Sequence, residues 1–87
     1  MSEAVNKTAP AVGAEQVALL ERLCNAAGVS GDEREVRAII LEQVKGLADE
    51  VRVDSLGSVL AVKHARVENP LRVMLDAHMD EVGFMIV

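Results

Sequence analysis

The sequence predicts an α/β fold in which two amphipathic helices precede about four strands of an incomplete sheet. Apolar residues recur at helical spacing over residues 14–27 and again over residues 33–47. From residue 50 onward, short runs rich in valine, leucine and isoleucine alternate with turn residues. Helices followed by strands are typical of a layered domain in which the helices pack on the sheet.

The composition indicates a globular chain of one domain at most. Hydrophobic residues make up 51% of the 87 residues and charged residues 26%, which excludes the low hydrophobicity of disordered chains. The net charge of -5 argues against binding to nucleic acid, which needs clustered lysine and arginine. No apolar run is long enough for a membrane span, and residues 1–16 lack the pattern of a signal peptide. These features predict a cytoplasmic protein without nucleic-acid or membrane partners.

Residues 1–13 are expected to form a flexible tail, because Pro10, Gly13 and many small or polar residues give no periodic signal. The ordered part is predicted to begin near Ala14. Residues 14–87 are therefore expected to form the folded part of the chain.

The sequence also predicts where the two helices stop and start. Gly28 is a plausible end for the first helix, and Cys24 on its apolar side is expected to be buried. Ser30 and Glu33 have the spacing of a capping box, which predicts the start of the second helix. Gly46 is expected to weaken the last turn of this helix.

The strand predictions begin with a hairpin. Residues 50–54 and 58–63 are rich in β-branched residues and flank a turn at residues 55–57. Residues 71–77 are predicted to form a third strand, and residues 84–87 the opening of a fourth. An apolar strand at the last residue would leave an unpaired edge, which predicts that the sheet continues beyond this chain.

One motif could carry chemistry. Asp76, His78 and Asp80 alternate, so in an extended segment they project from the same face. Neutral imidazole is a good ligand for zinc or cobalt, and a nearby carboxylate can bind the metal or hold the second ring nitrogen. The alternative is a strand end with solvated side chains. Glu81 is interpreted either as an acid or base beside the motif or as an exposed charge, and His64 as a solvated loop residue.

Three motifs in order resemble the glutamyl aminopeptidase and tetrahedral aminopeptidase family of metallopeptidases, some of whose members have been labelled endoglucanases. They are Ala27-Gly28-Val29-Ser30-Gly31, Val53-Asp54-Ser55-Leu56-Gly57-Ser58-Val59 and Ala77-His78-Met79-Asp80-Glu81-Val82-Gly83-Phe84-Met85. The similarity covers residues 16–87.

The resemblance implies the N-terminal part of a zinc-peptidase α/β catalytic domain in a cytoplasmic homo-oligomer that removes N-terminal residues from peptides. Two divalent ions, zinc or cobalt, would act in each site. By position, His78 corresponds to a metal ligand and Asp80 to the catalytic acidic residue that orients it. The family's other ligands lie further along its sequence, so this chain alone is expected to be inactive. The alternative function is a small α/β interaction module in which residues 84–87 add a strand to another sheet.

Overall fold

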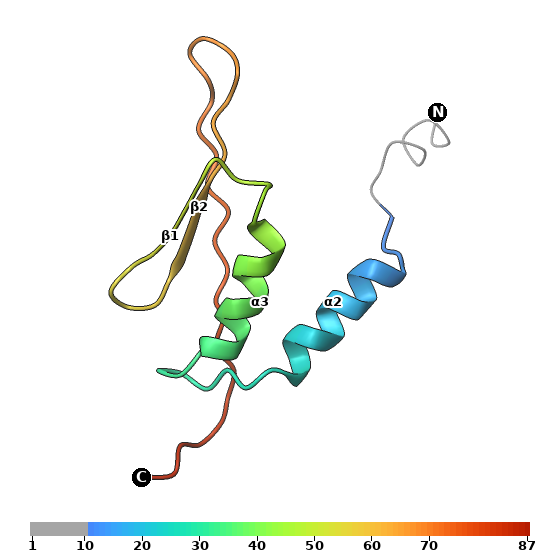
Figure 1. Ribbon diagram of the computed structural model, residues 1–87, viewed down its shortest axis with the longest axis vertical. Coiled ribbons are helices and arrows are strands. Elements are labelled where there is room, and N and C mark those ends of the chain that lie inside the picture. Colours follow the sequence, from blue (N-terminus) through green and yellow to red (C-terminus); the bar gives the residue numbers. More distant parts are fainter. Residues whose placement is uncertain (1–10) are drawn as a thin grey trace.

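The computed structural model describes residues 11–87 (Figure 1). Two helices precede a two-stranded sheet, which confirms the α/β class and the incomplete sheet. In chain order the elements are α2 (Ala14–Asn25), α3 (Arg34–Val44), β1 (Glu50–Val53) and β2 (Val59–Val62). Most of the predicted tail at residues 1–13 lies outside the described residues.

Helix α2 begins at Ala14, as its periodic pattern predicts. The Val17 backbone N–H donates to the Gly13 carbonyl at 3.1 Å, and the Gly13 N–H donates to Gln16 Oε1 at 2.8 Å. The prediction that Cys24 is buried is wrong, since this thiol is exposed. Helical spacing places Cys24 on the apolar side of α2, but burial needs a partner, and no described element covers that position.

Helix α3 begins at Arg34, later than the sequence predicts. The Ser30–Glu33 capping box is not formed, because Glu33 Oε1 accepts a hydrogen bond from the Gly31 N–H at 2.9 Å. Gly31 has a φ of 89°, a left-handed conformation that suits glycine. The chain therefore turns at Gly31 before the helix starts.

Strands β1 and β2 form the predicted antiparallel hairpin, with Val53 paired to Val59 beside the turn. Asp54 Oδ1 accepts hydrogen bonds from the N–H groups of Leu56 at 3.0 Å and Ser58 at 2.9 Å. A carboxylate that bonds the backbone a few residues ahead is a standard way of stabilising a turn. The hairpin is thus determined largely by local sequence.

The further strands predicted at residues 71–77 and 84–87 are not paired among the described residues, so the sheet has two strands rather than about four. Instead, the chain after β2 makes a loop and runs back past the hairpin and α3 toward the C-terminus (orange to red in Figure 1). A strand needs a neighbour for its backbone groups, and this segment has only one isolated bridge, from Val29 to Glu81.

The described part of the chain has a very small core. Ala26 and Val36 are its only buried apolar residues, at 8% and 6% exposure. The accessible surface is 8027 Å², whereas a compact monomer of this mass exposes about 5,000 Å². The radius of gyration is 16.6 Å, against about 12 Å for a compact domain of this length. Much apolar surface is therefore uncovered. Within residues 11–87 no helix has the length and apolar character needed to cross a membrane.

Candidate functional site

His78 and Asp80 lie together, as the sequence predicts. His78 Nδ1 is 2.9 Å from the Asp80 carbonyl oxygen and 3.0 Å from Asp80 Oδ1. A carbonyl oxygen can only accept a hydrogen bond, so Nδ1 carries the proton and donates it. The other ring nitrogen, Nε2, is left with its lone pair for a ligand. Within the described chain no hydrogen bond joins Asp76 to either residue.

The pair is open to solvent on one side. The His78 side chain is 84% exposed and the Asp80 side chain 43% exposed. Both line a shallow depression of about 430 Å³, together with Val29, Ser30 and residues 81–83. A metal ion or a small ligand could reach Nε2 from this side.

The donor chemistry fits a metal ion at one position only. A neutral imidazole such as that of His78 is a suitable ligand for zinc or cobalt, and Asp80 Oδ1 lies 3.0 Å from its Nδ1. Over residues 11–87, however, no three histidine, cysteine, aspartate or glutamate residues gather into a metal-binding group. A catalytic zinc normally has three protein ligands, which is more than the described residues bring together.

The connection between α2 and α3 touches the motif. The Glu81 N–H donates to the Gly28 carbonyl at 2.8 Å, and Val29 and Glu81 form a parallel bridge. The sequence pattern predicts only a helix end at Gly28 and does not predict this contact. The one available signal is that Gly28 lies in the first of the three motifs that carry the family resemblance. The Glu81 carboxylate is exposed, and only its backbone takes part in this contact.

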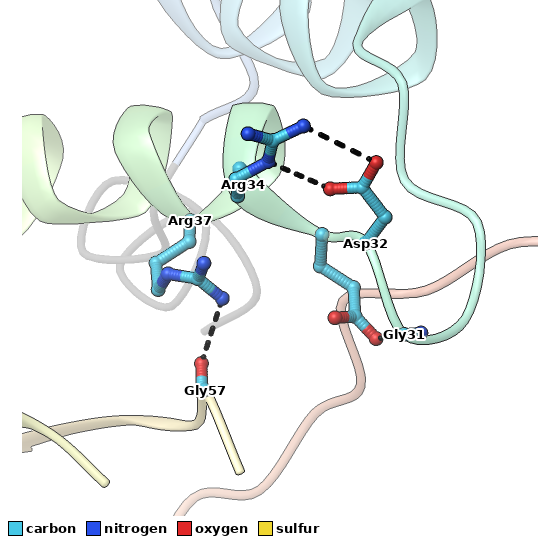
Figure 2. A network of polar contacts seen from close by, with 6 residues as sticks. Gly31, Asp32, Arg34, Arg37 and Gly57 are labelled. Carbon is cyan, nitrogen blue, oxygen red and sulfur yellow. Dashed lines mark hydrogen bonds and ion pairs between the residues drawn. The ribbon is translucent and has the colours of Figure 1, made fainter. Parts of the chain in front are cut away.

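Charged residues form polar contacts where the connection between α2 and α3 meets α3, as Figure 2 shows. Arg34 donates to both carboxylate oxygens of Asp32, at 2.8 Å and 3.4 Å. This hydrogen bond and the charge of Arg34 lower the pKa of the Asp32 carboxyl, and Asp32 raises the pKa of Arg34. Both side chains stay ionised near neutral pH. Arg37 donates to the Gly57 carbonyl at 3.2 Å and so ties α3 to the hairpin turn.

His64 is exposed, as expected, but it is paired. Its Nε2 lies 2.6 Å from Glu50 Oε2, and its backbone N–H donates to Asp49 Oδ2 at 2.6 Å. The backbone hydrogen bond is the main cause of the lowered pKa of the Asp49 carboxyl. These contacts link the chain just after β2 to the start of β1. Among the described residues, no hydrogen bond joins them to His78 or Asp80.

Comparisons with known proteins agree with the motifs. Residues 57–87 match the sequence model of the M42 glutamyl aminopeptidase family. The chain is 43% identical over 68 residues to a putative aminopeptidase of Acetivibrio thermocellus, an alignment that covers 78% of the chain and 20% of the relative. It is 39% identical over 69 residues to the lysyl aminopeptidase of Pyrococcus furiosus, with 78% and 19% covered. For the glutamyl aminopeptidase of Lactococcus lactis subsp. cremoris the identity is 42% over 57 residues, with 66% and 16% covered.

The chain thus spans about a fifth of the length of the first two of these relatives. No solved structure gives a significant match. The matched segment in the family comparison includes the whole His78 to Gly83 region. The chain is therefore similar to the M42 glutamyl aminopeptidases, which confirms the resemblance that the sequence predicts.

Proposed function

We propose that residues 14–87 form part of the catalytic domain of a metal-dependent aminopeptidase, in which His78 binds a divalent ion through Nε2. The observation that carries this proposal is the pair of hydrogen bonds from His78 Nδ1 to Asp80, at 2.9 Å and 3.0 Å. They leave Nε2 as the ligand atom and give Asp80 the role of an orienting carboxylate. The similar proteins are named aminopeptidases, which supports this reaction class.

A divalent ion bound at such a site would polarise the scissile carbonyl and generate hydroxide from water near neutral pH. The task of this chain is to hold one ligand in the correct tautomer. Asp80 accepts a hydrogen bond from the Nδ1–H group, so the imidazole cannot turn its protonated nitrogen toward the ion. The negative charge of Asp80 also makes Nε2 a stronger donor.

The proposal explains the open apolar surface. The chain exposes about 3,000 Å² more than a compact monomer of its mass, and many of its exposed residues are large and apolar. In the proposed enzyme, the remainder of the polypeptide covers this surface and supplies the other metal ligands. The 87-residue chain alone would be inactive.

The family resemblance extends the proposal to two ions per site, zinc or cobalt, to peptide substrates and to a homo-oligomer in the cytoplasm. Metal analysis of the purified complete enzyme and its sedimentation would test these points. A monomer without bound metal that still releases N-terminal residues would contradict them.

A second candidate function rests on the unpaired C-terminal segment. Phe84, Ile86 and Val87 are fully exposed, and their segment has no strand partner among the described residues. An exposed apolar segment of this kind can bind by adding a strand to another sheet. If the chain is an interaction module, its binding to another sheet should survive the loss of His78. If it is part of an aminopeptidase, peptide hydrolysis should not survive that loss.

The test is His78→Ala in the complete aminopeptidase, with His64→Ala as the matched control. Removing a metal ligand should nearly abolish turnover and lower the zinc content, because the ion that activates water is lost or displaced. The control removes the other histidine, which is paired with Glu50, and should leave both unchanged. Full activity and full metal content in His78→Ala would refute the proposed ligand role.

A further inference from the structure

The backbone that follows Asp80 is anchored to the connection between α2 and α3. The Glu81 N–H donates to the Gly28 carbonyl at 2.8 Å, and the adjacent Val29 pairs with Glu81 in a parallel bridge. Gly28 is buried, whereas most of the motif is exposed. The motif is therefore attached to the best-packed part of the described chain.

One peptide group joins this anchor to the imidazole. The peptide unit between Asp80 and Glu81 contributes the N–H that donates to Gly28 and the carbonyl that accepts from His78 Nδ1. A trans peptide is planar, and its N–H and C=O point in opposite directions. Fixing the Glu81 N–H toward Gly28 consequently fixes the Asp80 carbonyl toward His78.

The close approach at Gly28 requires the absence of a side chain. A Cβ there would lie 2.8 Å from Val36 Cγ2 and 3.3 Å from the Met79 carbonyl oxygen. Val36 is buried in helix α3, and a β-branched side chain in a helix has one strongly preferred rotamer, so it cannot easily move away. An added methyl group would push the connection away from Val36 and Met79.

Gly83 allows a second close approach between the motif and the connection. A Cβ at Gly83 would lie 3.2 Å from Val29 Cγ2 and 3.3 Å from Val29 Cβ, which is tighter than most real contacts. Gly28 accepts the Glu81 hydrogen bond from the connection, and Gly83 follows Glu81 by two positions in the motif. Together the two glycines allow the connection and the motif to touch.

We propose that Gly28 and Gly83 are positioning residues for His78. Their missing side chains let the connection hold the Asp80–Glu81 peptide group, and this peptide group holds His78 in the Nδ1–H tautomer with Nε2 free for a ligand. The value of this arrangement for metal binding rests on the proposed function. The positioning itself depends only on this chain.

The test reads the tautomer of His78 in the 87-residue chain by heteronuclear NMR of the ring nitrogens, without metal. The pH is held well above the ordinary histidine pKa of about 6.5, so that the ring is neutral. The wild-type chain should show the Nδ1–H tautomer. Gly28→Ala should shift His78 toward the Nε2–H tautomer and reduce the hydrogen-exchange protection of the Glu81 amide. His64 provides an internal reference in the same spectra.

Two further variants make the result specific. Gly46→Ala is the control for general destabilisation, since Gly46 has a φ of 81° but its added Cβ meets nothing within 4 Å. It should leave the His78 tautomer unchanged. Val36→Ala in the Gly28→Ala background removes the methyl carbon that the new Cβ would strike and should restore the Nδ1–H tautomer at least in part.

An unchanged tautomer and unchanged Glu81 protection in folded Gly28→Ala would overturn the proposal, as would an equal shift in Gly46→Ala. Should Gly28→Ala fail to fold, Gly83→Ala, with its milder contacts, decides the matter: a partial shift supports the positioning role and the wild-type tautomer refutes it. In the complete aminopeptidase, a shifted tautomer should accompany a loss of zinc affinity of about 10- to 100-fold. A shifted tautomer with wild-type zinc affinity would instead refute the ligand role of His78 and leave the positioning role intact.

Discussion

Replacing the Asp80 carboxylate by an amide should weaken metal binding without destroying the site. Loss of a residue that orients a metal ligand usually costs about 10- to 100-fold in affinity or activity. In this chain, His78 Nδ1 has two acceptors on Asp80, and the carbonyl oxygen at 2.9 Å survives the substitution. The amide oxygen of asparagine can also take the place of Oδ1. We therefore expect Asp80→Asn to lie near the lower limit, about tenfold or 1.4 kcal/mol.

The assay is a competition titration of the metal-free complete aminopeptidase with zinc and a chromophoric chelator, followed by turnover at saturating zinc. Excess zinc should restore part of the activity of Asp80→Asn. Asp76→Asn is the matched control, since no hydrogen bond joins Asp76 to His78 in the described chain, and it should bind zinc like the wild type. If Asp80→Asn at saturating zinc is as inactive as His78→Ala, Asp80 is a direct participant. Wild-type zinc affinity would show that the carboxylate does not orient the ring.

Three other predictions concern the framework. The hydrogen bond from the His64 N–H lowers the pKa of the Asp49 carboxyl, so the stabilisation from this carboxylate is present above its ordinary pKa of 3.8 and is lost as the pH falls through the lowered pKa of the folded state. Asp49→Asn should remove this acid dependence from the hydrogen-exchange protection of the His64 amide, and an unchanged dependence would contradict the prediction. Gly57→Ala should destabilise the hairpin by about 1 kcal/mol, because φ is 91°, a conformation that a residue with a side chain rarely adopts; wild-type exchange of the β1–β2 amides would refute this. Ile86→Lys should reduce self-association of the chain, because Ile86 is fully exposed on an unpaired segment; a wild-type chain that sediments as a monomer at high concentration would argue against it.

The sequence predicts the elements whose causes are local. Helix α2 starts at Ala14 because its apolar spacing starts there, and the hairpin forms because Asp54 and Gly57 suit its turn. The sequence predicts too early a start for α3, since the capping spacing of Ser30 and Glu33 is also compatible with a turn at Gly31. Short patterns such as this one are consistent with more than one backbone conformation.

Features that depend on distant residues were not predictable in this way. The pattern of residues 71–77 indicates a preference for extended backbone, but it does not indicate whether a partner strand is present. Among the described residues, these residues have no partner strand. Burial of Cys24 likewise depends on what packs against α2. In the site, the contact between His78 and Asp80 is predictable because only Met79 separates them in sequence, whereas the contact between Gly28 and Glu81 joins distant parts of the chain.

The hydrogen bond from Arg37 to Gly57 has a consequence for the order in which the chain loses structure. It joins α3 to the hairpin turn across 20 residues of sequence, and α3 also contacts β2, so we expect these elements to behave as one cooperative unit. Helix α2 is attached to α3 by the exposed ion pair of Arg22 and Glu42, and such pairs contribute little. We expect α2 to detach and exchange its amides first, while α3 and the hairpin open together. Simultaneous exchange of all three elements would show instead that the chain unfolds as one unit.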